Sequence, residues 1–154
     1  MDDRIKYWTD GECILRRYKN WFESTYFGGE AFPQIWLNLG PSGHAGYFKG
    51  ARHEFRDTVW FFPIIKDMEE DTPNFDLEGF LYKKTLELAE FFVKESKGDY
   101  FVSMPDTSGN IDALAHLRGS DKLLMDMATS PGAVKSALKK IQKAWETTNE
   151  AVYN

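Results

Sequence analysis

The sequence has one cysteine and no long apolar run, and each scarcity excludes a class of protein. Cys13 has no second thiol for an internal disulfide, and a lone thiol without CxxC or Cys/His spacing provides no zinc framework. No stretch approaches the ~20 apolar residues that span a bilayer, and the first residues lack the basic and apolar regions of a signal peptide. We therefore expect a cytoplasmic protein without a bound metal and without membrane association.

Blocks of one charge sign are also missing. The net charge of -5 comes from acidic and basic residues mixed along the chain, so we expect no nucleic-acid partner. With 154 residues, of which 42% are hydrophobic and 16% aromatic, the chain is long enough for one good core and short for two. We predict a single domain over residues 1–154.

Helices are predicted where apolar residues recur at three- and four-residue steps between capping signals. They run from a capping box at Thr9-Asp10-Gly11-Glu12 to the glycines at 28–29, over 44–49, over 77–95 with Asp76 as its cap, over 111–117, over 122–127, and onward from Ser130-Pro131.

Strands are predicted over 32–39, over 54–65 and over 100–104, where short apolar or β-branched runs are bounded by turn residues. The alternation of strands and helices favours βα units with parallel pairing. Two or three parallel strands cannot close a barrel, and their open edge is a liability for a free protein.

Two blocks of sequence resemble the uroporphyrinogen decarboxylase superfamily. The first is YFGGEAFP at 26–33 with WLNLGP at 36–41, and the second joins PD at 105–106, GNIDAL at 109–114, LRG at 117–119 and LLMD at 123–126. The resemblance implies a (β/α)8 barrel, which typically needs about 250 residues. We therefore expect an α/β fold that is a partial (β/α)8 TIM-barrel-like segment, with parallel strands and flanking helices, from the N-terminal half of such a barrel.

The family contains decarboxylases, which need no cofactor, and zinc-dependent methyltransferases that work with corrinoid proteins or coenzyme M. The acidic residue that cradles the pyrrole nitrogens in the decarboxylases has no counterpart around Gln34-Ile35-Trp36. Cys13, as the only thiol, leaves no set of zinc ligands of the methyltransferase kind. The resemblance thus implies a tetrapyrrole or a corrinoid-linked methyl donor as the small-molecule substrate, with no cofactor and no complete catalytic set in this chain.

In such barrels the residues that follow the C-terminal ends of the strands face the active site. The alternative to a binding function is a structural one, because Asp, Ser and Asn are also the residues that form turns and cap helices. A polar residue that interrupts an apolar strand needs a buried partner or a ligand. The substrate-binding candidates are Asn38 and His44 after the first predicted strand, and Asp106, Ser108, Asn110 and Asp112 after the strand at 100–104.

Two hypotheses for function stay open. The chain is the N-terminal region of a decarboxylase-like barrel, inactive alone, or it is a stand-alone module that binds a small ligand or forms a homodimer. Trp36 and Trp60 discriminate between them. Exposed tryptophans favour the barrel region, and tryptophans buried within one copy favour the self-complete module.

Overall fold

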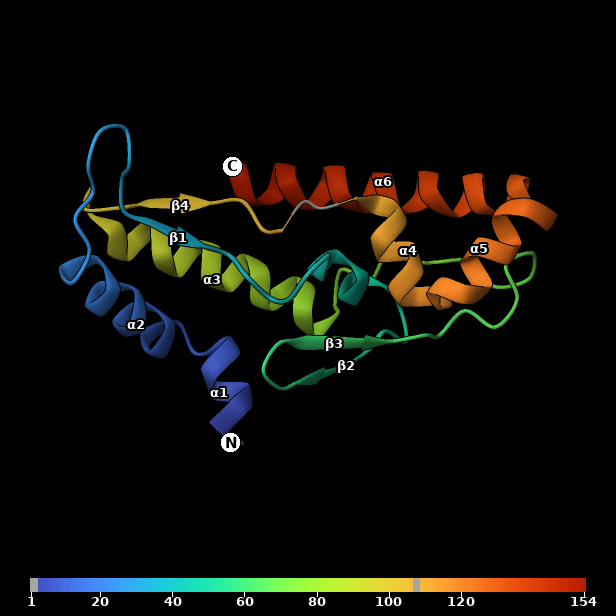
Figure 1. The fold of residues 1–154 in the computed structure, drawn as a ribbon, viewed down its shortest axis with the longest axis horizontal. Coiled ribbons are helices and arrows are strands. Elements are labelled where there is room, and N and C mark those ends of the chain that lie inside the picture. Colours follow the sequence, from blue (N-terminus) through green and yellow to red (C-terminus); the bar gives the residue numbers. More distant parts are fainter. Residues whose placement is uncertain (1–2, 107–108) are drawn as a thin grey trace.

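The fold comes from a computed structural model that describes residues 3–106 and 109–154. It is a mixed α/β fold with more helix than strand, drawn out along one axis (Figure 1). The elements in chain order are α1 (Asp3–Thr9), α2 (Gly11–Glu23), β1 (Gln34–Trp36), the 3-10 helix η1 (Gly43–Tyr47), β2 (Arg52–Phe55), β3 (Val59–Phe62), α3 (Phe80–Ser96), β4 (Phe101–Ser103), α4 (Asn110–Arg118), α5 (Ser120–Thr129) and α6 (Pro131–Tyr153).

Strands β1 and β4 form the parallel pair that the βα order predicts, with Ile35 opposite Val102. The chain between them passes through η1, strands β2 and β3, and α3, which lies along the pair (Figure 1). Across the described residues the sheets are this pair and one antiparallel pair. The structure thus shows the α/β class and one short parallel pair, and it does not confirm the expected partial (β/α)8 barrel.

The two faces of the parallel pair differ. Ile35 is fully buried and points into the core. The other face, which we call the open face, carries Gln34 and Trp36 from β1 and their register partners Phe101 and Ser103 from β4. Trp36 is 41% exposed and Phe101 is 65% exposed. Parallel strands are ordinarily covered on both faces, so the open face is an unpartnered surface.

Strands β2 and β3 form an antiparallel hairpin, in which Arg52 lies opposite Phe62. The region predicted as strand over 54–65 contains the end of β2 and all of β3, because the chain reverses where Arg56 N donates to the Thr58 carbonyl oxygen at 2.8 Å. Trp60, on β3, is 50% exposed.

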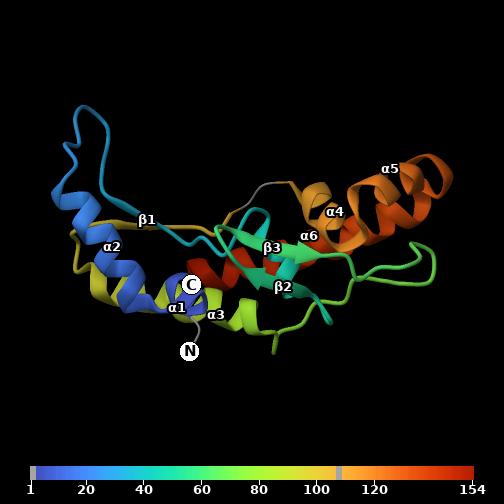
Figure 2. The same cartoon turned by 60° about the horizontal axis from the view of Figure 1, so that its bottom comes forward.

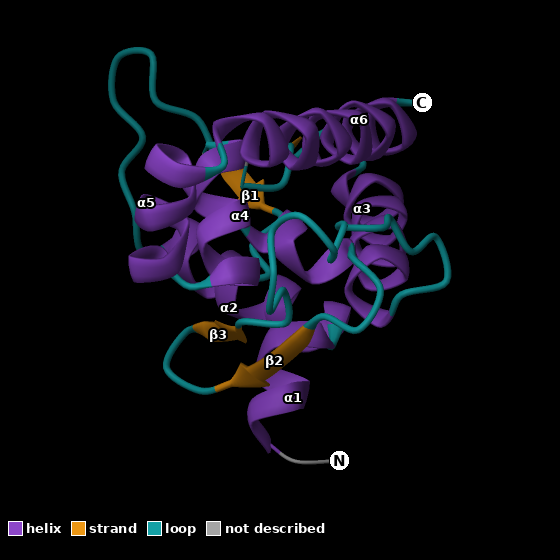
Figure 3. Ribbon diagram, turned by 90° about the vertical axis from the view of Figure 1, so that its right-hand side faces the viewer, coloured by secondary structure: helices purple, strands orange, loops and turns teal. Residues whose placement is uncertain are grey.

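Helices α4 and α5 and the first turns of α6 lie at the end of the molecule opposite α2, and α6 runs back from there along the molecule (Figure 2). Seen along the long axis, α6 lies above α3, and the hairpin lies at the opposite edge of the view from α6, next to α1 (Figure 3). The predicted start of the last helix is confirmed: Ser130 is its N-cap and proline follows at the first helical position. The buried residues of α6 keep one helical stripe: Val134, Ala137, Ile141, Ala144 and Thr148. Within the described ranges, no helix has the length and apolar character to cross a bilayer.

Arg118, at the end of α4, ties three segments together. Its Nε donates to Asp126 Oδ2 of α5 at 2.5 Å, and its Nη1 donates to the carbonyl oxygens of Ile65, at 3.3 Å, and Lys66. Arg118 is only 9% exposed. A nearly buried guanidinium with both a carboxylate and carbonyl acceptors is well satisfied, so it holds the segment after β3 against α4 and α5.

The predicted capping box is displaced by one residue. Asp10 is the N-cap of α2, and its carboxylate accepts from Cys13 N at 2.8 Å. Thr9 is instead the last residue of α1, where its buried hydroxyl donates to the Ile5 carbonyl oxygen at 2.6 Å. The helix also stops at Glu23 rather than at the glycines at 28–29.

Asp76 does not cap α3, contrary to expectation. Its carboxylate accepts from Glu78 N at 3.2 Å and its own N–H donates to the Tyr47 carbonyl oxygen at 2.8 Å, which fixes a turn. Helix α3 begins after this turn, with Gly79 as N-cap. The predicted strands at 32–39 and 100–104 are likewise shortened to β1 and β4, because only three residues of each form the ladder.

Candidate functional site

The loops that follow β1 and β4 meet, as parallel pairing requires. Ser42 N donates to Asp106 Oδ2 at 2.9 Å, which joins residues 64 positions apart in the sequence. Ser42 has a left-handed backbone with φ of 50°, an unusual conformation for a residue with a side chain. The contact with Asp106 supports that conformation and presents η1, directly after it, to the same corner of the molecule.

His44 is a buried polar side chain of this corner, with 3% exposure. Neither of its ring nitrogens has a hydrogen-bond partner in the part of the chain that the structure describes. Burial lowers the pKa of His44 because it disfavours the imidazolium, while the Asn110 side chain and the Asp106 carboxylate oppose this fall. The lowered pKa favours the neutral ring, which has one N–H donor and one acceptor.

Asn110, at the start of α4, has a similarly unmatched atom. Its Nδ2 donates to Gln142 Oε1 of α6 at 2.5 Å, but its buried Oδ1 has no partner among the described residues. The Asn110 side chain lies near His44 and affects its pKa, yet the two make no hydrogen bond of ordinary geometry. Most buried polar atoms in folded proteins are paired, so these atoms indicate a place for a ligand or water.

His116 of α4 completes the surroundings of His44, and the sequence analysis did not select it. Its ring is half-buried, with its centroid 5.3 Å from that of Phe61. Burial lowers the pKa of His116, against the effects of Asp112 and of the Pro41 carbonyl oxygen. The helical position of His116 gave no signal of this contact, because the neighbouring loop comes from a distant part of the sequence.

The predicted site residues thus fall into separate groups. His44, Asp106 and Asn110 share the corner beyond β1 and β4. Asp112 is exposed on the first turn of α4, near enough to raise the pKa of both His44 and His116. Ser108 lies outside the described residues. Chemically, the corner offers an imidazole, a carboxylate and an amide, which suit binding of a polar group.

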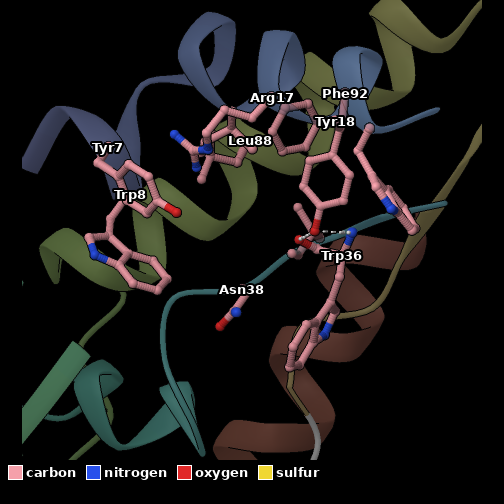
Figure 4. A pocket seen from close by; sticks show the side chains of 11 residues that line it. Tyr7, Trp8, Arg17, Tyr18, Trp36, Asn38, Leu88 and Phe92 are labelled. Atoms are coloured by element: carbon pink, nitrogen blue, oxygen red, sulfur yellow. Dashed lines mark hydrogen bonds between the residues drawn. The ribbon is translucent and has the colours of Figure 1, made fainter. Parts of the chain in front are cut away.

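Asn38 takes part in a different feature. Its Oδ1 accepts from Gly40 N at 2.9 Å, which shapes the loop after β1. Its side chain also lines a pocket of about 340 Å³, formed by α1, α2, α3 and the end of β1 (Figure 4). We call this the aromatic pocket, because Tyr7, Trp8, Tyr18 and Trp36 line it. Arg17 also lines it. No motif in the sequence predicted this pocket.

Comparison of the chain with models of known families, with curated proteins and with solved structures finds no match. The described residues also contain no group of three or more His, Cys, Asp and Glu side chains arranged to hold a metal ion.

Proposed function

We propose that this chain is the N-terminal region of a uroporphyrinogen decarboxylase-like protein and that the corner beyond β1 and β4 supplies part of the substrate site. The substrate class is a tetrapyrrole or a corrinoid-linked methyl donor. His44 and Asn110 bind a polar group of the substrate, and Asp106 holds the two loops together. The chain alone lacks a complete catalytic set and does not turn over substrate.

The observation that carries the proposal is the pair of unmatched side chains, His44 and Asn110, at the C-terminal end of a parallel strand pair. This end of the strands is where barrel enzymes place their substrate-binding loops. A substrate oxygen or N–H bound here would form hydrogen bonds with the buried His44 nitrogens and Asn110 Oδ1. A ligand without such a polar group would leave these buried atoms without partners, so the site selects for a ligand that carries one.

The open face supports a larger assembly of strands. Trp36 and Phe101 are exposed on the face that further strands of a barrel would cover, and Trp60 is exposed on the hairpin. Exposure of both tryptophans is the outcome that favours a barrel region over a self-complete module.

Equilibrium binding of reduced uroporphyrinogen to the purified chain tests the proposal. We expect weak binding without decarboxylation, and a loss of about tenfold in affinity for His44→Gln and for Asn110→Ala, since each removes one polar contact. His53→Gln is the matched control, because His53 lies on the hairpin, stacked on Phe80. Thermal melting of each variant separates loss of binding from loss of fold. Decarboxylation by the chain alone, or unchanged affinity in both variants, would contradict the proposal.

The second candidate is a stand-alone module in which two copies cover each other's open face as a homodimer. Light scattering on the purified chain tests it: a dimer that Trp36→Glu converts to monomer supports self-association through the open face. A monomer over the whole concentration range excludes this candidate.

A further inference from the structure

The aromatic pocket is built by elements that hold its walls in place. Trp8 Nε1 donates to the Arg56 carbonyl oxygen at 3.0 Å, which fixes the indole between α1 and the hairpin turn. The Tyr18 hydroxyl lies 3.3 Å from Trp36 N and 3.5 Å from the Trp36 carbonyl oxygen. Rings fixed in this way offer flat apolar surfaces without a further loss of side-chain freedom on binding.

Among the described residues that line the pocket there is one cation and no carboxylate. Arg17 projects from α2, with the guanidinium carbon 3.7 Å from the centroid of the Tyr7 ring. In the described part of the chain, Arg17 forms no ion pair with an acidic side chain. A guanidinium held on a ring face keeps its edge donors available, and these match the two oxygens of a carboxylate.

Asn38 provides a second polar group. Its Oδ1 is engaged by Gly40 N, which leaves the Nδ2 donor without a hydrogen bond to any described residue. Figure 4 shows Asn38 between Trp8 and Trp36, with Arg17 on the opposite side of the pocket. The two donor groups of the pocket, the Asn38 amide and the Arg17 guanidinium, are thus separated by an apolar lining. A few polar groups in an apolar lining are the usual composition of a small-molecule site.

We infer that the aromatic pocket binds a planar aromatic carboxylate of one or two rings, with the rings against Trp8, Tyr18 and Trp36 and the carboxylate on Arg17. The volume of about 340 Å³ lies at the lower end of the range for small-molecule sites, which favours a compact ligand. This inference does not depend on the decarboxylase-like proposal, because the pocket lies apart from His44 and Asn110.

Titration with 2-naphthoate, followed by isothermal calorimetry and by quenching of tryptophan fluorescence, tests the inference. The neutral analogue 2-naphthamide has nearly the same shape and isolates the contribution of charge. We expect naphthoate to bind at least about tenfold more tightly than the amide, because only the carboxylate can pair with Arg17.

Two variants of neighbouring arginines complete the experiment. Arg17→Gln should remove the preference for naphthoate and leave amide binding nearly unchanged, whereas Arg16→Gln, at an exposed position on the same helix, should preserve the preference. Melting curves establish that both variants fold. Equal affinity for the two probes, an unchanged preference in Arg17→Gln, or no binding of naphthoate up to about 5 mM would overturn the inference.

Discussion

The hydroxyl of Tyr18 takes the place of a neighbouring strand for Trp36: it lies 3.3 Å from the Trp36 N–H and 3.5 Å from the Trp36 carbonyl oxygen. Both backbone groups point away from β4, so they belong to the free edge of β1. Unpaired edges of this kind invite pairing with another chain. A side chain from α2 therefore protects an edge that a larger sheet would protect with a strand.

Tyr18→Phe removes only this hydroxyl and tests its contribution. The variant should be less stable by about 1 kcal/mol, the usual worth of a hydrogen bond that water can partly replace. Hydrogen exchange at the Trp36 amide should become faster, since its acceptor is lost. Unchanged exchange at Trp36 would show that the Tyr18 contact does not protect the edge.

Gly46 of η1 is predicted to tolerate no side chain. A Cβ atom at Gly46 would lie 2.3 Å from Leu81 Cδ1 and 3.0 Å from Phe61 Cε1, both in the core. Gly46→Ala should therefore lower the free energy of unfolding by about 1–3 kcal/mol. Gly132→Ala, in the first turn of α6, is the matched control and should be neutral or stabilising, because a Cβ atom there would meet no other part of the structure within 4 Å. Equal denaturation midpoints for the two variants would contradict the packing described around η1.

The stability of the fold should fall as the pH drops below 6.5. Burial lowers the pKa of His44, His53 and His116 below this ordinary value, so the unfolded chain binds more protons than the folded chain in that range. The stabilisation is complete above the unfolded pKa and is lost as the pH falls toward the folded values. Urea denaturation between roughly pH 5 and pH 7 measures this dependence.

His44→Gln should make that pH dependence shallower, because one of the three titrating groups is removed. The Asn110 side chain and then the carboxylates of Asp106 and Asp112 limit the pKa fall that burial causes at His44, so the change in slope measures the net effect of its surroundings. A slope identical to that of the unmodified chain would mean that His44 titrates normally in the folded state.

Arg118→Met should lower the melting temperature by roughly 5–10 °C, since a guanidinium that serves both a carboxylate and backbone carbonyls is lost. Arg16→Met, at an exposed position of α2, is the comparison for loss of an arginine as such. If both substitutions have the same small effect, Arg118 does not hold the segment after β3 in place.

Local signals predicted the parts of the fold that depend on nearby residues. The Ser130-Pro131 start of α6 and the alternation that places β1 and β4 in parallel are of this kind. Helix α1 was missed because its seven residues gain their position from distant contacts, such as the bond from Trp8 to the Arg56 carbonyl oxygen. The same dependence on tertiary contact shortened the predicted strands.

The sequence likewise predicted one part of the candidate site and missed another. The strand-end rule selected His44, Asp106 and Asn110, and parallel pairing does bring them to one corner. Their function in binding stays a prediction. The aromatic pocket was not predicted, because four separate elements form it and no spacing in the sequence marks their meeting.

The most direct test of the proposed substrate site is the imidazole nitrogen spectrum of His44, recorded by NMR while reduced uroporphyrinogen is added. The proposal predicts that the His44 signals shift as the ligand saturates the chain, while those of His53 on the hairpin stay in place. Saturation of the chain without a change at His44, or the absence of binding up to about 1 mM, would contradict the assignment of this corner as a substrate site.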